Sequence, residues 1–259
     1  MISMSKPLSY TQAESYLQKE NYYQQNSEKG YFYGNEKLLN ELGIDLGQEV
    51  DTTTYLHLLQ GVNPDNGESL ANNSEKEDRR VGIDVTTSAP KSVSILEEFY
   101  RANGNIEMAD KIRNAHFEAN LKAMESLSQY ARTRVYIDGT RTQVQANIIY
   151  ATFTHDTSRE NKINGTMDMQ LHNHNMIFNL AEHNGKIYSL SNEEIYRQKM
   201  FLGQSYRNEL AKNMRQLGYE IETTNYKEGF WEVKGFDREN HIETFSGRSK
   251  DITDKIDEY

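Results

Sequence analysis

The sequence predicts an α+β fold in which helices pack on an antiparallel sheet. Segments with the two-residue periodicity of strands and segments with helical periodicity follow one another without a regular strand–helix–strand order. The strand-like segments are 80–86, 144–155, 171–180 and 230–233. The helical segments are 11–25, 36–42, 106–130 and 193–217. The chain has no internal repeat and no phosphate-binding GxxxxGK[ST] loop, which excludes a nucleotide-driven motor of that kind.

The N-terminal region is predicted to begin with the helix at 11–25. Thr11 and Glu14 have the spacing of a capping box, and an apolar face begins directly after them. A second, short helix at 36–42 is followed by Gly43, a residue typical of helix ends. Residues 61–78 are rich in Gly, Asn, Asp and Ser and are predicted to form a loop.

The strand at 80–86 carries apolar side chains on one face and Asp84 on the other. The apolar residues are Val81, Ile83 and Val85. Ser88 is expected to cap the next helix, with Pro90 in its first turn, where proline is tolerated. A long amphipathic helix at 106–130 then precedes the central strands.

The C-terminal region is predicted to contain one long helix at 193–217, which ends at Gly218. A short charged helix is expected at 248–258. We expect the whole chain, residues 1–259, to form one domain.

Composition restricts the class of protein. The chain has 259 residues, 36% of them hydrophobic and 26% charged, which is typical of a globular domain. It lacks cysteine, so a metal ion would have to be bound by His, Asp or Glu. No apolar run is long enough to span a membrane and the N-terminus lacks the pattern of a signal peptide, so we expect a cytoplasmic protein without membrane insertion.

The net charge of −10 argues against indiscriminate binding to nucleic acid but leaves room for a local basic groove. Basic residues gather in two parts of the sequence. These are Lys76, Arg79, Arg80 and Lys91, and then Arg132, Arg134 and Arg141. Scattered charges on a solvated surface are the alternative interpretation of each cluster.

Three histidines form the pattern with the clearest chemistry. His172 and His174 are two apart in a predicted strand and therefore point to the same face. His155 ends the preceding strand, and an antiparallel hairpin would place it beside His172. Three imidazoles with open coordination positions are typical of a catalytic divalent metal site. The alternative is that each histidine is an ordinary surface or core residue.

Tyrosine is abundant, with 17 residues, six of them within the first 33. Tyr16, Tyr22 and Tyr23 fall in the first predicted helix, where packing of an aromatic face is one interpretation. The other is a nucleophile that attacks a phosphodiester, which needs a base or a nearby positive charge because a phenol has a pKa near 10. Asp84 could orient a metal-bound histidine or accept the phenolic proton; its alternative is an edge-strand aspartate that faces water.

Five stretches together resemble the relaxase domain of the MobF-type conjugative relaxases, the relaxase–helicases of plasmid transfer. In order along the chain they are SYLQKENYY, VGIDVTTSAPKSVSIL, THDTSR with QLHNHNMIFN, YRNELAKNMRQLGYEIE and FSGRS. The resemblance therefore covers nearly the whole chain, and we expect these 259 residues to lack the C-terminal helicase part of the family.

The resemblance implies a five-stranded antiparallel sheet flanked by helices, in a two-layer, palm-like arrangement with a histidine triad on the sheet. It implies a site- and strand-specific endonuclease that nicks one strand at a plasmid transfer origin through a tyrosine, retains the 5′ end as a phosphotyrosine and later rejoins the strand. His155, His172 and His174 would be the metal ligands, and Asp84 would activate the tyrosine.

Further expectations concern the nucleophile, the ion and the partners. Tyr16 is the expected nucleophile, with Tyr22 and Tyr23 as second candidates, because the first tyrosine pair of the family reads Ser15-Tyr16 here. Mg²⁺ or Mn²⁺ is the expected ion, although Zn²⁺ or Ni²⁺ would also bind tightly. The expected partners are single-stranded or hairpin DNA at a transfer origin, contacted by Arg80 and Lys91, and other relaxosome and coupling proteins.

Three alternatives remain at this stage. A rolling-circle replication initiator or a transposase would use the same chemistry, although these proteins generally place the tyrosine after the histidines. A DNA-binding module with a degenerate nucleophile is a second alternative, for which Ser15 is the first sign. A metallohydrolase that uses water as its nucleophile is the third.

Overall fold

The computed structural model describes residues 1–14, 29–70, 79–158 and 167–245. The strands are β1 (Ile2–Met4), β2 (Leu8–Ser9), β3 (Tyr31–Gly34), β4 (Arg80–Ser88), β5 (Arg132–Ile137), β6 (Thr140–Gln145), β7 (Asn147–Thr157), β8 (Met169–His183), β9 (Lys186–Tyr188), β10 (Ile221–Asn225) and β11 (Phe230–Val233). The helices are α2 (Glu36–Glu41), α3 (Thr52–Gln60), α4 (Lys91–Ala102), α5 (Ile106–Ser128), α6 (Glu193–Arg197) and α7 (Lys199–Gln216), with a π-helical turn η2 (Arg238–Ile242).

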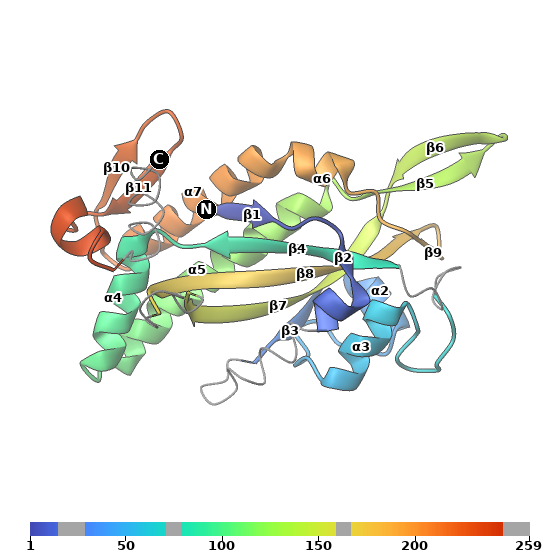
Figure 1. The fold of residues 1–259 in the computed structure, drawn as a ribbon, viewed down its shortest axis with the longest axis horizontal. Coiled ribbons are helices and arrows are strands. Elements are labelled where there is room, and N and C mark those ends of the chain that lie inside the picture. Colours follow the sequence, from blue (N-terminus) through green and yellow to red (C-terminus); the bar gives the residue numbers. More distant parts are fainter. Residues whose placement is uncertain (15–28, 71–78, 159–166, 246–259) are drawn as a thin grey trace, which may run out of the picture.

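A large antiparallel sheet forms the centre of the molecule (Figure 1), which confirms the predicted α+β class. Its main path has the order β1-β4-β8-β7-β3, and the short strands β2 and β9 pair with β4 and β8 and bring the sheet to seven strands. The path itself has the expected five strands. Two separate hairpins, β5–β6 and β10–β11, lie at opposite ends of the molecule (Figure 1).

Helices contact both faces of the sheet, so the arrangement has a partial third layer in addition to the expected two. Alternate apolar residues of β7 and β8 explain this. Phe153, Met176 and Phe178 pack with α2 and α3 in one core cluster. Their neighbours Tyr150 and Ile177 point to the other face and pack with Met124 and Leu127 of α5. A third cluster joins α4, α5, α7 and β11.

Several predicted elements have different bounds in the structure. Ser88 does not cap a helix: it is the last residue of β4 and pairs with His172, because strand pairing continues to this point. The helix α4 begins at Lys91, with Pro90 as its N-cap residue. The predicted helix at 193–217 is two helices, α6 and α7, separated at Gln198.

Neither α3 nor the β5–β6 hairpin was predicted from the sequence. α3 is capped by Asp51, whose Oδ1 accepts a hydrogen bond from the amide of Thr54 at 2.9 Å. The first predicted helix is described only for residues 10–14, and the charged helix predicted at 248–258 lies outside the described residues. In the described part of the chain, no helix combines the length and the apolar character that crossing a membrane would require.

Candidate metal centre

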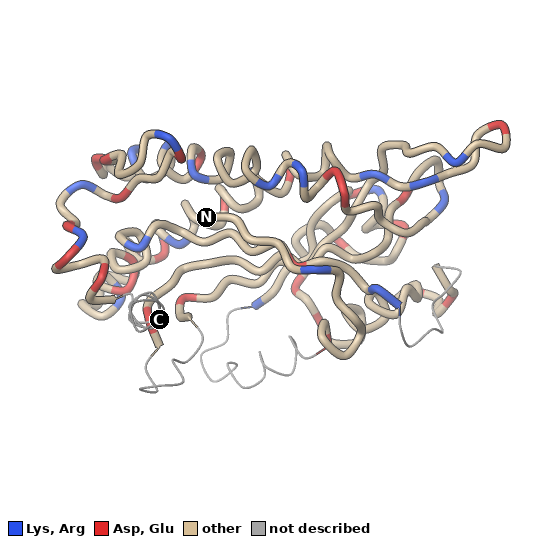
Figure 2. The backbone as a smooth tube through the Cα atoms, turned by 45° about the horizontal axis from the view of Figure 1, so that its top comes forward, with Lys and Arg blue, Asp and Glu red and all other residues tan. Residues whose placement is uncertain are grey.

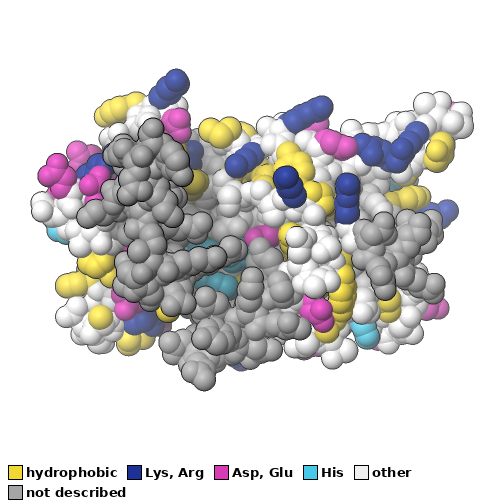
Figure 3. Space-filling view, viewed as in Figure 1, with side chains coloured by type: hydrophobic (Ala, Val, Ile, Leu, Met, Phe, Trp, Pro, Cys, Tyr) yellow, Lys and Arg dark blue, Asp and Glu magenta, His cyan; other side chains and the backbone are white. Residues whose placement is uncertain are grey.

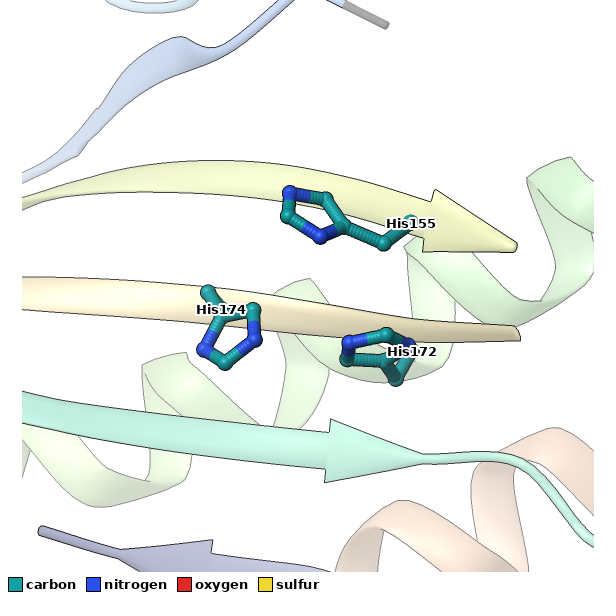
Figure 4. Close-up of side chains that lie close together, drawn as sticks. All are labelled: His155, His172 and His174. Carbon is teal, nitrogen blue, oxygen red and sulfur yellow. The ribbon is translucent and has the colours of Figure 1, made fainter. Parts of the chain in front are cut away.

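The three histidines come from the paired strands β7 and β8. His155 pairs directly with His172, and His174 pairs with Phe153, so the three side chains share one face of the sheet. Figure 4 shows the three rings turned toward a common point above the two strands. One ring nitrogen from each residue lies within 4.8 Å of those of the other two. The structure therefore brings together the three residues that the hairpin pattern predicted to converge.

Hydrogen bonds orient two of the rings. The Nδ1 of His172 lies 2.7 Å from the carbonyl oxygen of Gln170, and the Nδ1 of His174 lies 2.7 Å from Oδ2 of Asp84. Both oxygens are acceptors, so each Nδ1 donates a proton and the lone pair of the neutral ring is on Nε2. This is the arrangement that metal-binding histidines generally have, with the second nitrogen held by a carbonyl or carboxylate.

The surroundings of His172 favour its neutral form. Its side chain is buried, and burial together with the neighbouring His174 lowers its pKa to about 4. A neutral imidazole is the form that can donate its lone pair to a cation. His172 is therefore ready to bind an ion at neutral pH without first losing a proton.

Asp84 is buried beside His174, on the same face of the sheet, and not on an exposed edge. Asp84 is only 5% exposed, and its strand β4 lies between β1 and β8 in the sheet. The hydroxyl of Thr86 also donates to Oδ2 of Asp84, at 3.3 Å. The structure thus places Asp84 where it orients His174; its second expected role, acceptance of the phenolic proton, stays a prediction.

The donor set fits a divalent ion. Three neutral nitrogens hold a borderline or moderately hard divalent cation and leave coordination positions for oxygen ligands. His155 and His174 are only partly buried, and histidine side chains reach the surface near the middle of the face seen in Figure 3. A substrate oxygen could therefore approach the centre from this side.

The candidate tyrosines Tyr16, Tyr22 and Tyr23 lie outside the described residues. Two described residues before and after this stretch, Ala13 and Gly30, pack on the face of the sheet that carries the histidines. Ala13 belongs to the same buried cluster as Phe153, and Gly30 contacts the ring of Phe153. Phe153 is two residues from His155 and faces the same side. Ala13 and Gly30 therefore pack on the face that carries the histidines.

The two candidate phosphate contacts lie at different ends of β4. Lys91 follows β4 at the end where Ser88 pairs with His172, and its ammonium donates to the carbonyl of Met169 at 2.8 Å. Arg80 is exposed at the other end, eight residues before Ser88, which corresponds to about 26 Å of strand. Only Lys91 is near the histidines, and both residues stay predictions as DNA contacts.

Charge is distributed over the molecule without a single dominant patch in the described chain. Figure 2 shows acidic and basic positions interspersed along the tube. Arg132, Arg134 and Arg141 come together on the β5–β6 hairpin, where Arg141 pairs with Tyr136 across the two strands. This hairpin projects from the body of the molecule in Figure 1, with Arg132 at its base, where it donates to the carbonyls of Gln129 and Ala131.

Polar residues that were not predicted from the sequence lie on the opposite face of the strands that carry the histidines. Asn173 and Asn175 alternate with the two histidines of β8 and are fully buried. A strand that is buried and polar on both faces departs from the apolar alternation of an ordinary core strand. The segment LHNHN already has polar residues on both faces of the predicted strand, but only its histidines were predicted to have a role.

Comparison with known proteins agrees with this geometry. The family model described as TrwC relaxase matches residues 9–259. The multifunctional conjugation protein TraI of Escherichia coli strain K12 is 34% identical over 226 residues, and another Escherichia coli TraI is 32% identical over 225 residues. Each match covers 83% of this chain and 12% of the relative, so the chain spans about an eighth of the length of these curated relatives.

Solved structures of the conjugative relaxase TrwC are also similar. A copper-bound complex of TrwC with oriT DNA is 30% identical and has a TM-score of 0.80, covering 98% of this chain and 82% of that one. A complex of TrwC with a 27-mer DNA that comprises the recognition hairpin and the cleavage site is 29% identical, with a TM-score of 0.79 and coverage of 98% and 81%.

Proposed function

Because the chain belongs to the TrwC relaxase family, we propose that it is a conjugative DNA relaxase. It nicks one DNA strand at a plasmid transfer origin, keeps the 5′ end attached through a tyrosine and rejoins the strand after transfer. The observation that carries the proposal is the histidine triad, with the rings of His172 and His174 oriented by Gln170 and Asp84.

The proposed substrate is DNA that combines a hairpin with a single-stranded cleavage site. The support comes from TrwC, whose solved complexes contain oriT DNA, including the recognition hairpin. Other relaxosome and coupling proteins are proposed as further partners, because TraI is a conjugation protein. We place the reaction in the cytoplasm, where its DNA substrate lies.

The proposed reaction is a transesterification. The phenolic oxygen of a tyrosine attacks phosphorus, the bond from phosphorus to the 3′ oxygen breaks, and the departing oxygen becomes a 3′-hydroxyl. The 5′ phosphate is then joined to tyrosine, and the reverse reaction restores the DNA strand. The DNA phosphodiester is exchanged for a phosphotyrosyl ester and is not hydrolysed, so rejoining the strand needs no external energy source.

His155, His172 and His174 are the proposed ligands of a divalent ion. Such an ion supplies positive charge at the scissile phosphate and offsets the charge that develops there. We propose Mg²⁺ or Mn²⁺ as the working ion, and expect Zn²⁺ or Ni²⁺ to bind the three imidazoles more tightly. Asp84 holds the His174 ring so that Nε2 stays directed toward the ion.

Tyr16 is the proposed nucleophile, with Tyr22 and Tyr23 as rivals. Two observations support this choice: Ser15-Tyr16 stands where the family has its first tyrosine pair, and Ala13, three residues before Tyr16, packs in the core cluster on the face that carries the histidines.

A covalent-adduct assay tests the proposal. The protein is incubated with Mn²⁺ and a single-stranded oligonucleotide that carries a transfer origin and a label at its 3′ end. Attack at the scissile phosphate leaves the 3′ part of the strand on the protein, so the label should migrate with the protein on a denaturing gel. Phe substitutions at Tyr16, Tyr22 and Tyr23, made separately, should identify the residue that carries the label.

Two controls make the assay decisive. A His174→Ala variant should give no adduct, whereas His183→Ala, at a half-buried histidine outside the triad, should give as much as the wild type. Nicking without a labelled protein band, unchanged in all three Phe variants, would instead identify a hydrolase that uses water, and the tyrosine mechanism would be wrong.

A further inference from the structure

A layer of buried polar residues lies directly beneath the metal centre, on the opposite face of the same strands. Its members are Thr87 of β4, Asn120 of α5, Thr152 of β7, and Asn173 and Asn175 of β8. All five have no exposed surface. The same face is apolar elsewhere, where Met124 and Leu127 of α5 pack on Ile148 and Ile177.

Asn120 is the centre of this layer. Its Oδ1 accepts a hydrogen bond from the hydroxyl of Thr87 at 2.7 Å, and its Nδ2 donates to Oγ1 of Thr152 at 3.2 Å. It also forms a reciprocal amide pair with Asn175, with Nδ2 to Oδ1 distances of 3.0 and 2.8 Å in the two directions. One side chain of α5 therefore bonds to three neighbouring strands.

These contacts use the full bonding capacity of Asn120. A side-chain amide has two N–H donors and two lone pairs on its oxygen, and all four are engaged here. Asn175 uses its other N–H to donate to the carbonyl of Val85 at 2.8 Å, which adds a second link to β4. A buried network that is satisfied in this way holds its members in one arrangement.

The three strands that Asn120 joins are those that carry the metal centre. Thr87 is three residues from Asp84 on β4, and Thr152 is three residues from His155 on β7. Asn175 directly follows His174 on β8. A change in the separation of β7 and β8 would move His155 relative to His172 and His174, and a change in the separation of β4 and β8 would move Asp84 away from the ring of His174.

From this geometry we infer that Asn120 is a positioning residue of the metal centre, which sets the spacing of β4, β7 and β8 so that the three imidazoles share one ion. The inference rests on the proposed metal-binding function. A network of buried polar groups is weak evidence for stability, because an apolar replacement is often as stable. Directional hydrogen bonds do restrict geometry more narrowly than apolar contacts do, and a metal site needs its ligands placed to within about 0.5 Å.

The test compares two asparagine variants of equal size. Asn120→Leu removes every hydrogen bond that this side chain makes to the three strands. Asn213→Leu is the matched control: Asn213 is buried on α7, and it donates to the carbonyl of Ala115 of α5 at 3.1 Å, a bond that joins two helices. Both proteins are first shown to be folded by circular dichroism, and the Kd for Mn²⁺ is then measured by calorimetry without DNA.

We expect Asn120→Leu to bind Mn²⁺ about tenfold more weakly than the wild type, in the range seen when groups behind metal ligands are removed. Asn213→Leu should differ from the wild type by less than about twofold, even where both variants have a lower Tm. The visible absorption spectrum of bound Co²⁺ should change in Asn120→Leu alone, because it reports the geometry of the ligands. If Asn120→Leu and Asn213→Leu both lost Mn²⁺ affinity in proportion to their loss of Tm, Asn120 would have a merely structural role and the inference would be overturned.

Thr152→Val and Thr87→Val provide a second test that does not depend on the folding of Asn120→Leu. Each removes a single bond of the network while keeping the shape of the side chain, and each should weaken Mn²⁺ binding by a few-fold. Wild-type affinity in folded Thr152→Val and Thr87→Val would overturn the inference alone. An absence of Mn²⁺ binding by the wild type would overturn the metal centre, and with it the proposed function.

Discussion

At the scale of the residue, the protonation of the imidazoles determines whether the centre can bind a metal ion. The hydrogen bonds from Nδ1 of His172 and His174 leave Nε2 of each ring available as a metal ligand. Asp84 contributes more than position, because a carboxylate acceptor also raises the basicity of the ring that it holds. The sequence identified Asp84 but not the carbonyl of Gln170, since a backbone oxygen leaves no mark in the sequence.

Replacement of Asp84 tests this contribution. Asp84→Ala should raise the Kd for Mn²⁺ by about 10- to 100-fold, because the proton on Nδ1 of His174 loses its acceptor and the ring can turn. Asp84→Asn retains an acceptor oxygen without the charge and should fall between Asp84→Ala and the wild type. Calorimetry measures both, with Asp110→Ala on the exposed side of α5 as the control. Equal affinity in Asp84→Ala and the wild type would contradict an orienting role.

His116 makes a different contribution, because it is fully buried on α5 and its Nδ1 lies 2.6 Å from the hydroxyl of Tyr206. Burial, followed by the nearby His172, places its pKa well below the ordinary value of 6.5. Below about pH 6.5 the unfolded chain therefore binds a proton that the native protein does not. The free energy of unfolding should fall on acidification by up to about 1.4 kcal/mol per pH unit for this one proton.

Denaturant unfolding at several pH values measures this effect. His116→Gln, which can still bond to Tyr206, should have a shallower decline than the wild type between pH 6.5 and pH 5. The two curves should run parallel at pH 8, where the imidazole is neutral in both states. Curves that are parallel over the whole range would contradict the assignment of this proton to His116. His172, with its pKa near 4, acts in the same direction and remains in both proteins.

At the scale of the element, periodicity predicted the parts that carry the histidines and missed those that depend on distant contacts. β4, β7, β8 and α5 were predicted because each is long and has a recognisable apolar periodicity, of two residues in the strands and of about 3.6 residues in the helix. The hairpin β5–β6 has no apolar face to detect: most of its residues are exposed or half-buried. Ser88 was misassigned because its pairing with His172 is a long-range contact that local capping preferences do not reveal.

The contact between β3 and β7 offers a test at this scale. Gly30 lies against Phe153, and a Cβ at this position would overlap the phenylalanine ring. Gly30→Ala should therefore lower the free energy of unfolding by about 1–3 kcal/mol, the range for overpacking of a core. Urea unfolding measures this loss.

Phe153→Leu in the same chain should recover part of the loss, because a smaller side chain makes room for the added methyl group. The recovery distinguishes a steric clash from a general cost of replacing glycine. If the two substitutions are simply additive, the two residues do not interact and the proposed attachment of this segment is wrong.

At the scale of the whole molecule, the fold places the three histidines on the face of the sheet that α2 and α3 also cover, next to the apolar residues that pack with these helices. The face behind the centre is covered by α5, which is polar at Asn120 and apolar at Met124 and Leu127. Sequence periodicity predicted α5 as an amphipathic helix but could not distinguish which part of its inner face meets the metal strands. That distinction depends on the register of helix and sheet, which only the folded molecule defines.

Because the ligands come together only in the folded chain, metal binding should stabilise the whole molecule. Mn²⁺ at 100 times its Kd should add about 2.7 kcal/mol to the free energy of unfolding, and a chelator should remove this gain. Differential scanning calorimetry, with and without Mn²⁺, measures the corresponding rise in Tm. The rise should vanish in His174→Ala and persist in His183→Ala, whose Nδ1 bonds to the carbonyl of Gln145 away from the triad. An equal rise in both variants would place the ion elsewhere, and the three histidines would then be ordinary residues of the sheet.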